Sequence, residues 1–168
     1  VMGDVGSDIY VRETIPPFLR DKAVKSADII TPNLFELSLL ADRQLTNLNE
    51  IVKAARGQIA LGPKIVLVTS VIREGQAGDI VEMLVVDKAS AYILSTPKID
   101  FQITPNGAGD VTAALFLAYS LKGMAMNEAL EHVARAVYAM FTSSYQKNSR
   151  ELQVISAQDR SVSAHRPL

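Results

Sequence analysis

The chain has 168 residues, of which 48% are hydrophobic and 21% are charged, so it is long enough to build a domain with a buried core. A formal net charge of −1 excludes the strongly basic surface that is typical of proteins binding nucleic acid or anionic lipid. The absence of cysteine excludes disulfides, thiolate catalysis and cysteine-zinc sites, and it favours a reducing compartment. With only two histidines a histidine-rich metal site is not expected, and neither a membrane span nor a signal peptide is predicted.

The first third of the chain is predicted to alternate loops, helices and one strand. The opening "VMGDVGSDIYV" is rich in glycine and is predicted to be a loop. A helix is expected to begin at Pro16, because proline is favoured in a first turn, and to end before Asp28. The β-branched run in "ADIITPN" predicts a short buried strand stopped by Pro32. Helices are then predicted from Asn33 and over "TNLNEIVKAARGQIA".

The remaining sequence is predicted to add three strands and two helices. The aliphatic run "KIVLVTS" (64–70) is typical of a central parallel strand that is covered on both faces. After the turn "REGQAGD", the runs "IVEMLVVD" and "SAYILSTP" are predicted to form an antiparallel pair. Helices are expected at about 108–121 and from 127, with a partly irregular tail after 150. This alternation indicates an α/β fold with a mostly parallel central sheet flanked by helices.

Ligands bind at the carboxyl ends of strands in such sheets, and this rule selects three places: 31–36, 69–70 and the loop at Gly107. In the third, the run 107–110 (Gly-Ala-Gly-Asp) stands at the predicted start of a helix. Free amides and the helix dipole favour an anion there, and the glycines permit close approach. Asp110 is then placed to take a proton from a hydroxyl that attacks a phosphoryl group. An equally weighted interpretation is an ordinary acid in a first helical turn.

The other two places carry polar side chains with two interpretations each. Asn33 and Glu36 share a helix face and could hold a Mg²⁺–water cluster beside nucleotide phosphates. For this motif alone the favoured interpretation is a capping box, in which the two side chains accept hydrogen bonds from free backbone N–H groups at the start of the helix. Thr69 and Ser70 could offer hydroxyls to phosphates, although a turn at the strand end is favoured in isolation.

Four motifs occur in order, "VMGD", "ADIITPNLFE", "IVLVTS" and "NGAGD", and together they resemble the ribokinase-like superfamily, with the pyridoxal kinases as the most similar branch. The "ELQV" near Glu151 fits the same pattern, so the resemblance covers residues 1 to about 159. It implies a single ribokinase-like domain over 1–168 that holds the nucleotide-binding portion. Because the chain starts at Val1 rather than at methionine, we expect the N-terminal, substrate-binding portion to be absent.

The resemblance also implies roles for individual residues. Asp110 looks like the base that activates the substrate's 5′-hydroxyl and contacts the substrate. The backbone of Gly107, Ala108 and Gly109 looks like the anion hole for the transferred phosphoryl group. Acids near the metal and the ATP phosphates are implied at two positions, Asp4 and Glu36. Nucleotide contacts are implied at Thr31, Asn33, Thr69 and Ser70, and an adenine-lining segment at Thr96, Pro97, Lys98 and Ile99.

The function implied is an ATP-dependent, Mg²⁺-requiring kinase of pyridoxal and related B6 vitamers, cytoplasmic and homodimeric when complete, with a monovalent cation such as K⁺ as a further cofactor. Nucleic acid and membranes are not expected as partners. Thr104 and Pro105 replace the Asp-Thr that sugar kinases usually show, which argues against a sugar substrate. A hydroxymethylpyrimidine or other small-alcohol kinase is the first alternative, although such kinases typically carry cysteine where Asp110 stands. The second alternative is a truncated, non-catalytic nucleotide-binding fragment.

Overall fold

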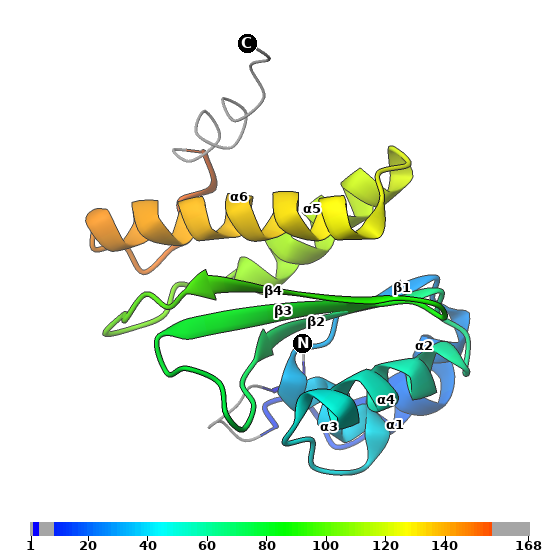
Figure 1. The fold of residues 1–168 in the computed structure, drawn as a ribbon. Coiled ribbons are helices and arrows are strands. Elements are labelled where there is room, and N and C mark those ends of the chain that lie inside the picture. Colours follow the sequence, from blue (N-terminus) through cyan, green and yellow to red (C-terminus); the bar gives the residue numbers. More distant parts are fainter. Residues whose placement is uncertain (1, 4–8, 156–168) are drawn as a thin grey trace. The chain divides into compact units, whose positions relative to one another are not determined.

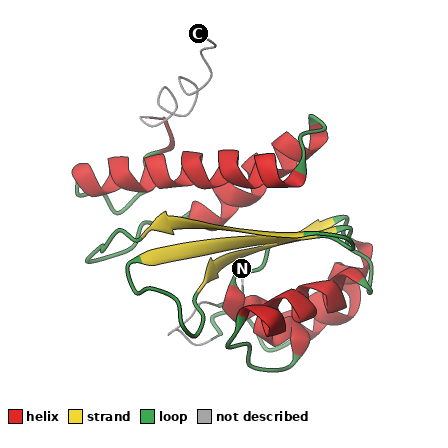
Figure 2. Cartoon of the chain, in the orientation of Figure 1, coloured by secondary structure: helices red, strands yellow, loops and turns green. Residues whose placement is uncertain are grey.

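The computed structural model describes residues 2–3 and 9–155. The chain divides into two compact units, Val1–Ser95 and Thr96–Leu168, and each is described by itself. Figure 1 shows the chain as a ribbon coloured along the sequence. Figure 2 shows the same view coloured by secondary structure. The expected single domain over 1–168 therefore stays a prediction.

Among its described residues, the first unit carries three helical segments before its first strand and two helices after that strand. The helix predicted from Pro16 forms as a continuous helical run in three parts, α1 (Ile15–Phe18), the π-helix η1 (Leu19–Ala23) and α2 (Val24–Ser26). Proline in the first turn of α1 is the feature that predicted this start. The strand and helices that follow are β1 (Ile29–Ile30), α3 (Leu34–Ala41) and α4 (Leu48–Ile59).

A four-stranded sheet in the order β1-β2-β3-β4 is completed by β2 (Ile65–Val71), β3 (Ile80–Val86) and β4 (Ala91–Pro97). β1 and β2 pair in parallel, because α3 and α4 supply the crossover that parallel strands need. β2 and β3 pair antiparallel across the short connection 72–79. The α/β class with a helix-flanked sheet is confirmed. The strand directions are mixed rather than mostly parallel, since a short connection can only return the chain beside its own strand.

The core of this unit lies between the sheet and the two helices of the crossover. Leu37 of α3 and Ile51 of α4 are fully buried and belong to one apolar cluster with Val66, Val68 and Leu84 of the sheet. Figure 1 shows α3 and α4 side by side. Leu67 and Val85 alternate to the other face of the sheet and are also fully buried. The aliphatic run 64–70 is therefore fully buried at Val66, Leu67 and Val68 of β2.

The second unit is built on α5 (Ala108–Leu121) and α6 (Met126–Gln146), which pack against each other. Gly123 has a φ of +76° and turns the chain between them. One face of α6 is buried, including Leu130, Val133 and Val137. The Phe101 ring lies with its centroid 5.6 Å from that of Phe141. Within the described parts of the chain, none of the helices combines the length and hydrophobicity of a bilayer span.

Candidate active site

Two side chains at the start of α3 cap this helix by accepting hydrogen bonds from its free backbone N–H groups. Asn33 has extended backbone angles, and its Oδ1 accepts the N–H of Glu36 at 2.8 Å. Glu36 Oε2 in turn accepts the N–H of Asn33 at 2.9 Å. These two reciprocal bonds are a capping box, so the structural interpretation of the Asn33–Glu36 pair is confirmed. The implied metal role of Glu36 stays a prediction beside it.

The same two side chains also fasten the opening segment of the chain. Met2 donates its N–H to Glu36 Oε1 at 2.5 Å, and Asn33 Nδ2 donates to the carbonyl of Gly3 at 2.8 Å. Glu36 is only 7% exposed, so its carboxylate is buried with one backbone N–H on each oxygen. Asp4, predicted as a metal acid, lies outside the described residues. Met2 and Gly3 nevertheless lie against the helix start that carries Glu36.

The start of α4 offers an internal comparison, because Asn47-Leu48-Asn49-Glu50 repeats the Asn-Leu-x-Glu pattern of α3. Asn47 Oδ1 accepts the N–H of Glu50 at 3.0 Å, and Glu50 Oε2 accepts the N–H of Thr46 at 2.9 Å. The hydrogen bond from the Thr46 backbone lowers the pKa of Glu50. Glu50 is partly exposed and engages a residue of its own helix start, whereas Glu36 is buried beneath a segment 34 residues away. Capping alone therefore does not account for the surroundings of Glu36.

The ends of β1 and β2 lie side by side, because the two strands pair in parallel. Thr69 donates its N–H to the carbonyl of Pro32 at 3.0 Å, and an isolated parallel bridge joins Asn33 to Thr69. Thr31 lies in the same connection and is partly buried. Four predicted nucleotide-contact residues, Thr31, Asn33, Thr69 and Ser70, are thus gathered at one edge of the sheet.

Ser70 has an unusual backbone conformation that the sequence did not indicate. Its φ of +50° lies in the left-handed region, which costs a non-glycine residue about 1–2 kcal/mol. The ladder between β2 and β3 is irregular between Val68 and Val71, so Ser70 belongs to a β-bulge. Strained residues of this kind cluster at ligand sites, where the surrounding structure holds them. A turn was predicted at this strand end, but β2 continues to Val71 around the bulge.

The start of α5 differs from both capped helices. Gly107 is its N-cap with a φ of +93°, a conformation that glycine adopts without strain. In the part of the chain that the structure describes, no side chain caps this start. The first-turn amides of Ala108, Gly109 and Asp110 are therefore available to an anion. Asp110 is exposed in the first turn, beside these donors.

The glycine loop is supported from the far end of the same unit. An isolated parallel bridge joins Asn106, which precedes Gly107, to Glu151 of the "ELQV" stretch. The fully buried Ser144 of α6 accepts the N–H of Gln153 at 2.9 Å through its Oγ and so holds this stretch. Sequence reasoning missed Ser144, because a serine inside a helix shows no local signal of a contact nine residues away.

The remaining predicted nucleotide residues lie at the end of β4 and directly after it. Thr96 and Pro97 end the strand, and Lys98 forms an exposed ion pair with Asp100 at 3.3 Å. The division between the units falls before Thr96. The predicted site residues thus belong to two units, with 31–36 and 69–70 in the first and 96–99 and 107–110 in the second.

A cluster of three or more histidine or acidic side chains that could hold a metal does not occur among residues 2–3 and 9–155. The Glu36 carboxylate still fits a role beside a hydrated cation. Among residues 2–3 and 9–155, each of its oxygens accepts one backbone N–H, and a carboxylate oxygen has two lone pairs. Mg²⁺ usually keeps several of its waters, and these waters can donate to such an acid.

Comparison with known proteins assigns the chain to a family. Residues 1–154 match the family model described as phosphomethylpyrimidine kinase. The chain belongs to this family. Among curated relatives it is 43% identical over 164 residues to pyridoxal kinase PdxY of Rubrobacter xylanophilus and 40% identical over 159 residues to pyridoxal kinase PdxY of Corynebacterium diphtheriae. These alignments cover 96% and 95% of the chain but 56% of each relative, so the chain spans about half the length of the curated relatives it matches.

Solved structures agree with this assignment. Pyridoxal kinase from Leishmania donovani, in complex with ADP and pyridoxine, has a TM-score of 0.82 at 27% identity and matches 96% of this chain and 55% of its own. Plasmodium falciparum PdxK, with the ligands AMP-PNP and PL, has a TM-score of 0.81 at 26% identity and matches 96% of this chain and 54% of its own. The resemblance to pyridoxal kinases that the motifs indicated is confirmed.

Proposed function

We propose that this chain carries the nucleotide-binding and proton-accepting part of an ATP-dependent kinase that phosphorylates the 5′-hydroxyl of pyridoxal and related B6 vitamers. The observation that carries the proposal is the start of α5, where uncapped amides and the exposed Asp110 stand together. The pyridoxal kinase relatives at 40–43% identity and the nucleotide-bound structural neighbours support the same activity.

The chemistry follows from these groups. The Asp110 carboxylate accepts the proton of the substrate hydroxyl, and the hydroxyl oxygen forms a bond to the γ-phosphorus. The bond between that phosphorus and the bridging oxygen breaks, and ADP leaves with the electron pair. The amides of Ala108 and Gly109, with the turn at Gly107, donate to the transferred phosphoryl oxygens. These donors are oriented by the fold before the substrate arrives, so they need no reorganisation during the reaction.

Nucleotide contacts are proposed at both units. Thr31, Asn33, Thr69 and Ser70 would contact the phosphates, and residues 96–99 would line the adenine. Mg²⁺ would be held through its waters by Glu36, with Asp4 as the second acid, and when bound it neutralises charge on the phosphates. A monovalent cation such as K⁺, a homodimeric assembly and a cytoplasmic location are proposed from the same resemblance.

A pyrimidine substrate is the second candidate, because the matching family model is described as phosphomethylpyrimidine kinase. Asp110 argues for the B6 vitamers, since hydroxymethylpyrimidine kinases typically carry cysteine at this position. Both candidates share the helix start and the phosphate site, so only the substrate separates them.

A substrate panel tests the proposal. The full-length protein that contains this chain is incubated with MgATP and, in separate reactions, with pyridoxal, pyridoxine, pyridoxamine or hydroxymethylpyrimidine, and the phosphorylated product is measured by mass spectrometry. We expect product from pyridoxal. Product from hydroxymethylpyrimidine alone would instead support the second candidate. Tight binding of AMP-PNP without any product would support a nucleotide-binding module and reject the kinase.

A further inference from the structure

A buried ion pair lies in the hairpin that follows the predicted phosphate contacts. Arg73 donates from Nε to Glu82 Oε2 at 2.8 Å and from Nη2 to Glu82 Oε1 at 3.0 Å. The Glu82 side chain is 4% exposed and that of Arg73 is 25% exposed. The hydrogen bonds to Glu82 raise the pKa of the Arg73 guanidinium, so Arg73 stays protonated. This bidentate geometry, with two parallel N–H···O hydrogen bonds, is the strongest form of an arginine–carboxylate ion pair.

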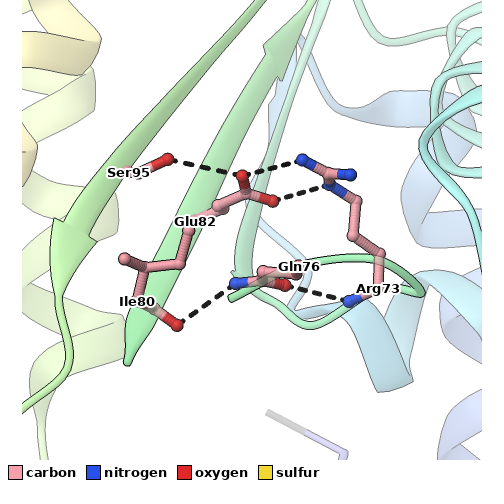
Figure 3. Close-up of polar contacts among 5 residues, drawn as sticks. All are labelled: Arg73, Gln76, Ile80, Glu82 and Ser95. Atoms are coloured by element: carbon pink, nitrogen blue, oxygen red, sulfur yellow. Dashed lines mark hydrogen bonds and ion pairs between the residues drawn. The ribbon is translucent and has the colours of Figure 1, made fainter. Parts of the chain in front are cut away.

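Three further contacts extend the ion pair into a network (Figure 3). Arg73 donates its backbone N–H to Gln76 Oε1 at 3.0 Å, and Gln76 Nε2 donates to the carbonyl of Ile80 at 3.1 Å. Ser95 of β4 donates from Oγ to Glu82 Oε1 at 3.3 Å. The network therefore closes the connection 72–79 and ties together residues at the ends of β2, β3 and β4.

The network lies directly beside the bulge that contains Thr69 and Ser70. Val68 pairs with Leu84, and Val71 pairs with Glu82. Three residue steps on β2 therefore face two steps on β3, which leaves one extra residue on β2 between the two pairs. The pair nearer to the connection is the one that includes Glu82. The ion pair thus holds the register immediately after the left-handed Ser70.

Stability alone is a weak reason for such a pair, because taking two charges out of water offsets most of their attraction. A strained residue needs surroundings that hold it. We propose that the Arg73–Glu82 pair is a positioning device, which maintains the bulge so that Thr69 and Ser70 face the nucleotide phosphates. This inference rests on the proposed function, since it takes 69–70 as phosphate contacts.

The test measures AMP-PNP affinity of the full chain by calorimetry. Glu82→Gln should weaken binding about tenfold, equivalent to about 1.4 kcal/mol. Ser70→Gly should remove this sensitivity, because glycine adopts the left-handed conformation without support. The Glu82→Gln/Ser70→Gly double variant should therefore bind AMP-PNP within about twofold of Ser70→Gly alone, a difference well below the roughly tenfold (about 1.4 kcal/mol) effect expected with Ser70 in place.

Asp28→Asn is the control, since it breaks the exposed Asp28–Lys64 ion pair (2.8 Å), which lies before the start of β2. Its affinity should equal that of the unaltered chain.

A purely structural role would give a different result. In one such result, Glu82→Gln lowers the melting temperature and leaves AMP-PNP affinity unchanged. In another, Glu82→Gln weakens AMP-PNP binding by the same factor whether residue 70 is Ser or Gly. Either result overturns the inference. Should Glu82→Gln fail to fold, Arg73→Lys serves instead, because lysine keeps the charge without the two-pronged contact. Unchanged affinity in Arg73→Lys would overturn the inference too. The failure of the proposed function is seen separately, in the unaltered chain. If that chain does not bind AMP-PNP, the proposed function itself is rejected, whatever the variants do.

Discussion

The starts of α3 and α5 each place an acid in the first turn of a helix, yet the two acids have opposite surroundings. Glu36 is 7% exposed, and both of its oxygens accept backbone N–H groups. Asp110 is exposed, and in the described residues its helix start has no side-chain cap. The same local position therefore serves two purposes. The buried Glu36 holds the helix start and the opening segment in place, in addition to the Mg²⁺ role proposed for it, whereas the exposed Asp110 beside free amides is available to a substrate.

The largest expected effect concerns the exposed acid. Asp110→Asn should reduce kcat by about 10²–10⁴-fold, because the amide cannot accept the hydroxyl proton. AMP-PNP affinity and the urea midpoint should be unchanged, since Asp110 is exposed. The control is Glu131→Gln on the surface of α6, which should leave kcat as it is. Normal turnover by Asp110→Asn would remove the base assignment and with it the contrast between the two helix starts.

The buried acid should show its effect in stability. Glu36→Gln places an amide NH₂ against a backbone N–H and should lower the free energy of unfolding by about 1–3 kcal/mol. Glu50→Gln in the matching Asn-Leu-x-Glu start of α4 is the control and should cost less, because Glu50 is partly exposed. Urea unfolding measures both values. An equal loss in the two variants would mean that the contact between Glu36 and Met2 contributes nothing.

The glycine start can be tested with a pair of alanines. Gly107→Ala should lower the free energy of unfolding by about 1–2 kcal/mol, because its φ of +93° is unfavourable for a residue with a Cβ. Gly109→Ala should not destabilise, since Gly109 lies inside the helix and a Cβ there would meet no atom within 4 Å. Thermal unfolding compares the two. A similar loss in both would contradict the assignment of the cost to the backbone conformation of Gly107.

The smallest expected effect is the pH dependence of the α4 start. The pKa of Glu50 is lowered in the folded chain by the Thr46 N–H, so its contribution is present above the unfolded-state pKa and is lost as pH falls through the folded-state value. The melting temperatures of the unaltered chain and of Glu50→Gln should therefore differ slightly at pH 7 and converge well below about pH 4. A difference that persists in acid would contradict the carboxylate's role.

Much of the fold was predictable because it depends on neighbouring residues. The aliphatic run 64–70 predicted β2, proline at 16 predicted the first helical run, and glycine at 107 predicted the start of α5. The mixture of parallel and antiparallel pairing in the sheet was not predicted, because the short connection 72–79 decides that β3 returns beside β2. The bulge at Ser70 was missed as well, since the threonine-serine pair looks like an ordinary strand end.

The sequence by itself determined the contacts that span three or four residues, of which the Asn33–Glu36 box is the clearest example. Only the tertiary structure decided that Met2 donates to Glu36, that Asn33 lies beside Thr69 and that Arg73 meets Glu82. The physical reason is that a helix cap forms within one turn, whatever surrounds it. Contacts between distant residues exist only after packing has brought their strands and helices together, and that packing is the sum of many weak apolar contacts that no single motif records.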